Sequence, residues 1–181
     1  MVKYIILFCS MMFLVSCKPD VPSNVISSYS VDMDGDGVPE HITYYHKNGA
    51  KDSIYLAIER LNHDRWGAVF NEMVDGSILG FLSLDGGLKA VVLVTPPQGS
   101  GGFTGYKVIG GYFLTTIYER VGVYQGSFGL DSNKIVEESG DPLPTDADCC
   151  PSYTLRRVIE LKDRDNRHWD PVNVIETRRK N

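Results

Sequence analysis

Acidic side chains gather in one short segment in the first third of the chain. Residues 32–40 read DMDGDGVPE, so carboxylates stand at positions one, three, five and nine of the segment. Ca²⁺ takes about six to eight oxygen ligands, and a tight loop supplies them from alternate side chains and one backbone carbonyl. The segment therefore predicts a calcium site. Its expected ligands are the side chains of Asp32, Asp34, Asp36 and Glu40 and the carbonyl oxygen of Val38.

The sequence around this loop differs from that of an EF-hand. Gly37 stands at position six, where such loops turn sharply, but position twelve is Thr43 instead of a bidentate glutamate. Residues 42–45 (ITYY) predict a strand and not a helix. The loop therefore resembles the strand-flanked calcium loops of FG-GAP/VCBS-type repeats, in which an acid at position nine closes the site. The alternative is an acidic turn that holds no ion, although carboxylates so close together repel one another without a cation.

Two adjacent cysteines form a second unusual segment, DADCCPS at residues 146–152. Spare thiols of an exported protein tend to be oxidised, so Cys149 and Cys150 can pair with each other or with another molecule. A disulfide between adjacent residues closes a small, strained ring. We interpret the pair as a vicinal disulfide in a rigid turn. The alternatives are a redox switch or a metal-binding pair, which no CxxC motif or nearby histidine supports.

No residues in the chain have the spacing of a known catalytic motif. The glycine-rich residues 96–103 (PPQGSGGF) lack the lysine and helix of a P-loop and the flanking pattern of a nucleophile elbow, so they predict a flexible surface loop. An anion held by backbone amides is the alternative. His41 and His46 flank one predicted strand on opposite faces. We expect no enzymatic activity from these segments or from the four histidines, which are His41, His46, His63 and His168.

The N-terminal residues have the features of an export signal. A basic start at Lys3 precedes an apolar stretch that is too short to span a bilayer, so residues 1–16 predict a signal peptide. The sequence LVSC at residues 14–17 resembles the lipobox of bacterial lipoproteins. That resemblance implies a Cys17 acylated with fatty acids such as palmitate, which anchor the chain to a membrane of the cell envelope. An ordinary signal peptide with a chance cysteine is the alternative. Lys18, in place of an aspartate, favours the outer membrane in a Gram-negative host.

Composition narrows the classes of protein and partner. The 181 residues predict one domain, and 43% hydrophobic residues argue against both a disordered tail and a multi-span membrane protein. Removal of residues 1–16 takes away only Lys3 among the charged residues, which leaves 17 basic against 23 acidic residues and a net charge of −6. Because nucleic-acid binding requires a basic face, this balance argues against such a partner.

The apolar segments predict a mainly β fold of short antiparallel strands with few helices, in a twisted sheet, a sandwich or a partial propeller. The segments are short, rich in β-branched and aromatic residues and bounded by turn residues. We assign residues 17–30 to the lipidated cysteine and a tether, and residues 31–181 to one β-rich domain. Two echoes suggest repeated β units, with chance similarity as an equal explanation. The segment 58–66 resembles the segment 159–169. The acidic loop and the strand after it resemble LDGG at 84–87 and the strand after that.

The order of these motifs resembles that of LppP/LprE-type envelope lipoproteins. The shared elements are the lipobox, the acidic loop, the glycine-rich loop, VGVY at 121–124 and, most specifically, CCPS at 149–152. The resemblance covers about residues 32–162, and the segment 169–180 does not match it. It implies an envelope location and a β-rich fold, since the molecular role of that family is not established.

Three classes of function follow from these observations. The leading hypothesis is a membrane-anchored, non-catalytic binding or structural module that holds Ca²⁺ and has a protein or glycan partner in the envelope. The second is an inhibitor or immunity-type lipoprotein that blocks an envelope-targeting enzyme or toxin, for which an acidic surface would speed association with a basic rim. The third is an envelope hydrolase with an unrecognised site.

Overall fold

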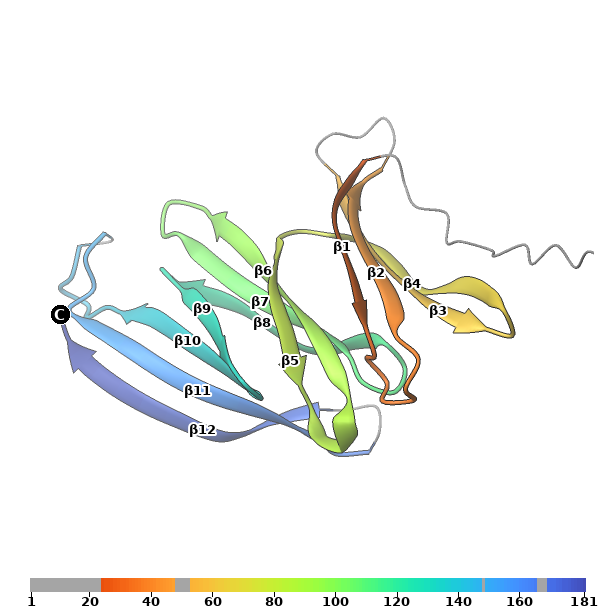
Figure 1. Cartoon of the computed structure of the whole chain (residues 1–181). Coiled ribbons are helices and arrows are strands. Elements are labelled where there is room, and N and C mark those ends of the chain that lie inside the picture. Colours follow the sequence, from red (N-terminus) through yellow and green to blue (C-terminus); the bar gives the residue numbers. More distant parts are fainter. Residues whose placement is uncertain (1–23, 48–52, 148, 166–168) are drawn as a thin grey trace, which may run out of the picture.

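A computed structural model of the chain describes residues 24–47, 53–147, 149–165 and 169–181 (Figure 1). Within these ranges the chain is mainly β, as the sequence predicts, and its strands form three antiparallel sheets. One short 3₁₀ turn, η1 (Asp85–Gly87), is the only helical element among the described residues. No helix in these ranges has the length and apolarity that a membrane span needs. Cys17 and residues 1–16 lie outside the described residues, as does His168.

Each sheet has four strands that follow one another in chain order. Sheet 1 consists of β1 (Val25–Val31), β2 (Glu40–His46), β3 (Ile54–Asn62) and β4 (Arg65–Val74). Sheet 2 consists of β5 (Ser77–Ser83), β6 (Lys89–Gln98), β7 (Phe103–Gly110) and β8 (Thr115–Tyr124). Sheet 3 consists of β9 (Ser127–Asp131), β10 (Lys134–Asp141), β11 (Tyr153–Asp163) and β12 (Trp169–Lys180). The chain thus builds the same four-stranded meander three times.

Strand β1 corrects the boundary between tether and domain. Residues 25–30, which the sequence assigns to the tether, pair with β2 from Val25↔Tyr45 to Val31↔Glu40. The serine-rich composition hides an alternation in which Tyr29 and Val31 pack on the first hydrophobic cluster while Ser28 and Ser30 are exposed. Period-two alternation is the pattern of a half-buried strand. The domain therefore begins at least six residues earlier than the sequence suggests.

Both sequence echoes fall at equivalent places in the meanders. The segments 58–66 and 159–169 each span the connection between the third and fourth strands, in sheet 1 and sheet 3 respectively. The acidic loop and LDGG at 84–87 each join the first and second strands, in sheet 1 and sheet 2. Only two residues link one sheet to the next, at 75–76 and 125–126. This agreement favours a repeated unit over chance similarity.

The link between sheet 1 and sheet 2 requires a glycine. Gly76 has φ +141°, and a Cβ atom there would lie 2.2 Å from the carbonyl oxygen of Val94 in β6. The carbonyl oxygen of Gly76 also accepts a hydrogen bond from the hydroxyl of Tyr44 in β2. A side chain at this position would push the link away from both sheets.

Sheet 2 lies between the other two and buries both of its faces. One hydrophobic cluster joins sheet 1 to sheet 2 and includes Val91 and Leu93 of β6. A second cluster joins sheet 2 to sheet 3 and includes Ala90 and Val92 of the same strand. Alternate residues of a strand point to opposite faces, so a run of apolar residues suits a strand that is covered on both sides.

A buried ionic network also crosses from sheet 2 to sheet 3. Glu137 in β10 is fully buried, and its carboxylate accepts hydrogen bonds from Arg120 Nε of β8 at 2.9 Å and from Arg157 Nη1 of β11 at 2.8 Å. Arg157 Nε also donates to Glu176 of β12 at 2.6 Å. A buried charge is tolerated when such partners replace its water.

We expect Glu137→Gln to lower the free energy of unfolding by about 3 kcal/mol, because it leaves two guanidinium groups facing a neutral amide in a partly buried site. The matched control is Glu138→Gln on the same strand. Glu138 points to the opposite face, is 53% exposed and pairs with Arg156 at 3.7 Å, so its loss should cost under about 1 kcal/mol. Urea unfolding of both variants checks this, and equal losses would contradict a special role for the buried network.

Candidate metal centre

The acidic loop joins β1 to β2 at the end of the stack opposite to Val25. Asp32 shapes it, since its two carboxylate oxygens accept hydrogen bonds from the amides of Gly35 at 2.8 Å and Gly37 at 3.0 Å. Both glycines have positive φ, +75° and +86°, a conformation that side chains disfavour. The alternation of aspartate and glycine therefore folds the loop around the first carboxylate.

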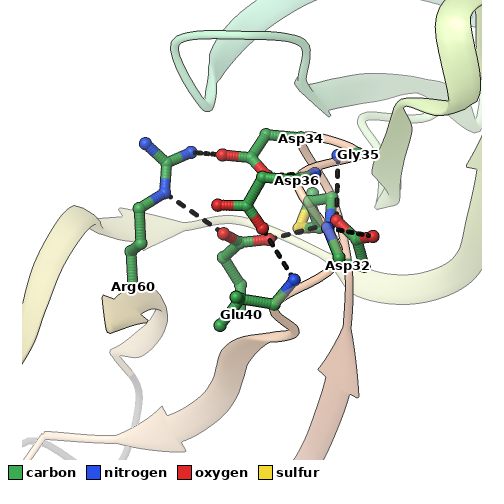
Figure 2. A network of polar contacts seen from close by, with 9 residues as sticks. Asp32, Asp34, Gly35, Asp36, Glu40 and Arg60 are labelled. Carbon is green, nitrogen blue, oxygen red and sulfur yellow. Dashed lines mark hydrogen bonds and ion pairs between the residues drawn. The ribbon is translucent and has the colours of Figure 1, made fainter. Parts of the chain in front are cut away.

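The structure brings three of the five predicted ligand residues together. Asp32, Asp34 and Glu40 each place one carboxylate oxygen within 4.8 Å of the others (Figure 2). Asp36 is exposed and lies outside this group, and its carboxylate accepts a hydrogen bond from the amide of Val38 at 2.7 Å. Val38 is 40% exposed at the rim of the loop. The cluster is thus a three-carboxylate centre with a fourth acid beside it.

Glu40 ties this centre to the core. Its side chain is 1% exposed, and its carboxylate accepts a hydrogen bond from the amide of Met33 at 2.7 Å. The carbonyl oxygen of Met33 in turn accepts a hydrogen bond from the amide of Lys89, the first residue of β6, at 2.8 Å. The loop is therefore fixed both to its own sheet and to sheet 2.

Arg60 is a residue of the site that sequence reasoning missed. Its guanidinium forms an ion pair with Asp34 and donates from Nε to Glu40 at 3.1 Å (Figure 2). The antiparallel register of β2 and β3 pairs His41 with Glu59, which brings the next residue of β3 beside Glu40. No local signal marks this arginine, because twenty positions separate it from its partner. It neutralises part of the charge that a cation would otherwise balance.

The three histidines among the described residues lie outside the carboxylate group. His41 Nε2 lies 2.9 Å from Ser28 Oγ, and its Nδ1 lies 3.6 Å from Glu59 on the outer face of sheet 1. His46 shares the face of Ile42 and Tyr44, so the two histidines of β2 lie on opposite faces as predicted. His63 lies in the turn between β3 and β4. None of these three belongs to the carboxylate group.

The adjacent cysteines lie in an exposed turn that is well held by hydrogen bonds. Asp146 accepts bonds from the amides of Leu143 and Ser152, both at 2.7 Å, and from the Ser152 hydroxyl, and these bonds lower the pKa of its carboxyl. The amide side chain of Gln125, from the link between sheets 2 and 3, donates to the carbonyl oxygen of Cys149 at 3.2 Å. None of these hydrogen bonds involves a sulfur atom.

The sulfur atoms of this turn lie side by side at the surface. Cys149 Sγ and Cys150 Sγ are 2.6 Å apart, and both residues are exposed. The contact with Cys149 raises the pKa of the Cys150 thiol. The glycine-rich loop is a neighbour, because the amide of Gln125 donates to the carbonyl oxygen of Gly102 at 3.2 Å.

Comparisons of the chain with protein-family models, with curated proteins and with solved structures find no match. The assignment of the site therefore depends on its own geometry.

We expect alkylation without reductant to leave Cys149 and Cys150 unmodified in protein from an oxidising compartment, because the exposed sulfur atoms can close on each other. Intact mass before and after reduction checks this. Changing both residues to serine should cost little stability, since the closed ring constrains the unfolded chain hardly at all. Two alkylated thiols in freshly isolated protein would contradict the vicinal disulfide.

Proposed function

We propose that this chain is a lipid-anchored envelope protein, a non-catalytic binding module whose acidic loop takes up Ca²⁺. The observation that carries the calcium part is the convergence of Asp32, Asp34 and Glu40 within 4.8 Å. Carboxylate oxygens are the ligands that Ca²⁺ prefers, and three carboxylates supply up to about six oxygens when they bind in bidentate fashion. Asp36, the carbonyl of Val38 and water would complete the shell.

Arg60 is proposed to act as the internal competitor of the ion. In the structure its guanidinium balances Asp34 and Glu40 (Figure 2). A divalent ion at the same carboxylates would displace or repel this single positive charge. The arginine therefore stabilises the ion-free loop and weakens the affinity for Ca²⁺, which suits a site that fills at the high calcium concentrations outside cells.

The position of the loop supports a role in recognition. The strand that follows the proposed anchor begins at Val25, at one end of the stack, and the acidic loop lies at the opposite end (Figure 1). An anchor at Cys17 would thus direct the calcium end away from the membrane. We propose that this end, stiffened by the ion, meets a protein or glycan partner in the envelope.

The anchor is tested by replacing its attachment point. We expect Cys17→Ala to yield an unprocessed or unanchored form, because the acyl chains have no residue to join. Metabolic labelling with a fatty acid, followed by fractionation of membranes, checks this. Cys9→Ala is the matched control within the leader and should label like the wild type. Equal labelling of the Cys17 variant and the wild type would contradict the lipoprotein assignment.

The ion is tested by thermal unfolding. We expect Ca²⁺ to raise the melting temperature, with a stabilisation of about 2.7 kcal/mol at a hundredfold excess over the dissociation constant. Mg²⁺ should do less, because it requires a smaller octahedral shell. Asp34→Asn should weaken the response to Ca²⁺. Arg60→Gln should lower the melting temperature without Ca²⁺ and increase the affinity for the ion, because it removes the competing charge.

Arg65→Gln, an exposed arginine of β4, is the matched control for Arg60 and should change neither quantity. Calorimetric titration of the same variants gives the affinities directly. If Ca²⁺ produces no heat and no shift of the melting curve in the wild type, the loop is an acidic turn and the calcium proposal fails.

A further inference from the structure

A cleft opens where the links between the sheets lie, at the end of the stack opposite to the acidic loop (Figure 1). Its volume is about 540 Å³. Sites for small molecules commonly have volumes of about 300–1,000 Å³ and combine apolar walls with a few polar groups. Each of the two links contributes one glycine to the wall, Gly76 and Gly126. The cleft thus lies at the junction of the sheets and has the size of a small-molecule site.

Two prolines at the end of β6 form the apolar side of this cleft. Pro96 and Pro97 together stand opposite one residue of β7, Thr104, which makes a β-bulge. A proline has no amide hydrogen to donate to a neighbouring strand, so it suits a bulge. Ile54 of β3 and Val94 of β6 extend the apolar wall. A ligand would meet mainly carbon atoms on this side.

Two buried hydroxyl groups of the cleft donate their hydrogen atoms to the protein itself. The Tyr44 hydroxyl donates to the carbonyl oxygen of Gly76, and the Thr104 hydroxyl donates to that of Thr95. Burial, and after it the negative charge of Asp75, raises the pKa of the Tyr44 hydroxyl, so this group stays protonated. Because a hydroxyl has a single hydrogen, both oxygen atoms can only accept a further bond. This part of the cleft therefore favours a ligand that donates hydrogen bonds.

Asp75 is the one charged side chain among the described residues that line the cleft. It stands in the link between β4 and β5, and the side-chain amide of Gln98 donates to its Oδ2 at 3.1 Å. This bond holds the carboxylate beside the end of β6 and leaves further lone pairs for another donor. A carboxylate next to an apolar wall is complementary to a cation with an apolar body.

We propose that this cleft binds a small organic molecule that carries a primary ammonium group. Such a group has one positive charge, three N–H donors and no acceptor, which matches the carboxylate of Asp75 and the acceptor oxygens of Tyr44 and Thr104. The apolar body of the molecule lies on the proline rings. A quaternary ammonium group fits less well, because it has no hydrogen atom to donate.

The cleft is independent of the acidic loop and of the proposed anchor. None of its lining residues belongs to the group of Asp32, Asp34 and Glu40. The acidic loop also attracts cations, but it lies at the other end of the stack. A measurement that reports on single residues can therefore separate a ligand in the cleft from a cation at the loop.

Titration of the full chain with benzylammonium, followed through the backbone amide signals in NMR spectra, tests the proposal. We expect saturable shifts at Gly76 and Gly126 and no comparable shift at Gly35 in the acidic loop. Benzyl alcohol has the same apolar body without the charge, and benzyltrimethylammonium has the charge without an N–H donor. Each of these two should bind about tenfold more weakly than benzylammonium, or worse.

Two variants alter the cleft in different ways. Asp75→Asn should raise the dissociation constant for benzylammonium by about tenfold or more, because it removes the charge and keeps the size of the side chain. Ser77→Phe should prevent binding, because Ser77 is an exposed residue of the wall and a phenyl ring there fills the cleft. Asp131→Asn is the matched control for charge, since Asp131 is exposed at the opposite end of β9, and it should leave the dissociation constant unchanged.

Any one of four results would overturn the ammonium site. They are the absence of saturable shifts at the two link glycines, shifts centred on Gly35, binding of benzyl alcohol as tight as that of benzylammonium, and equal effects of Asp75→Asn and Asp131→Asn. Circular dichroism and the melting temperature verify that each variant is folded. If Asp75→Asn unfolds, Ser77→Phe and the comparison of the three ligands on the wild type decide.

Discussion

Burial of sheet 2 on both faces is the constraint on which the rest of the structure depends. Residues 90–93 of β6 alternate between two hydrophobic clusters, so one strand contributes to the packing of all three sheets. Neither outer sheet buries its apolar face without this central one. The same strand also holds the acidic loop in place, because the amide of Lys89 at its start donates a hydrogen bond to the carbonyl oxygen of Met33.

Two buried glutamates approach this central sheet from opposite sides. Glu40 and Glu137 stand in the second strands of sheet 1 and sheet 3, and each is bound by an arginine of the neighbouring third strand, Arg60 or Arg157. The two sites differ in access. Glu137 lies within a strand and pairs with two arginines, Arg120 and Arg157, which suits a structural role. Glu40 lies at the base of a loop with two further acids, where we propose that an ion from solvent competes with one arginine.

The sequence predicts the elements of this fold better than their partners. Short β-branched segments predict the strands, and the echoes at 58–66 and 159–169 indicate the repeat, because both signals are local. The strand at 25–31 was missed because serines hide its alternation. Arg60 and Glu137 could not be found, because their roles arise from strand register and from packing between sheets that are distant in sequence. In the acidic loop, spacing predicts the convergence of four carboxylates, of which three meet and that of Asp36 does not, and it gives no sign of the arginine that binds two of them.

Native-state hydrogen exchange tests the central role of sheet 2 most directly. We expect the amides of residues 90–93 to exchange only through global unfolding, because both neighbouring sheets must leave before β6 meets water. The amides of β12, at the edge of sheet 3, should exchange through smaller openings. Exchange of β6 that is as fast as that of β12, under conditions where the protein remains folded, would contradict a structure organised around its middle sheet.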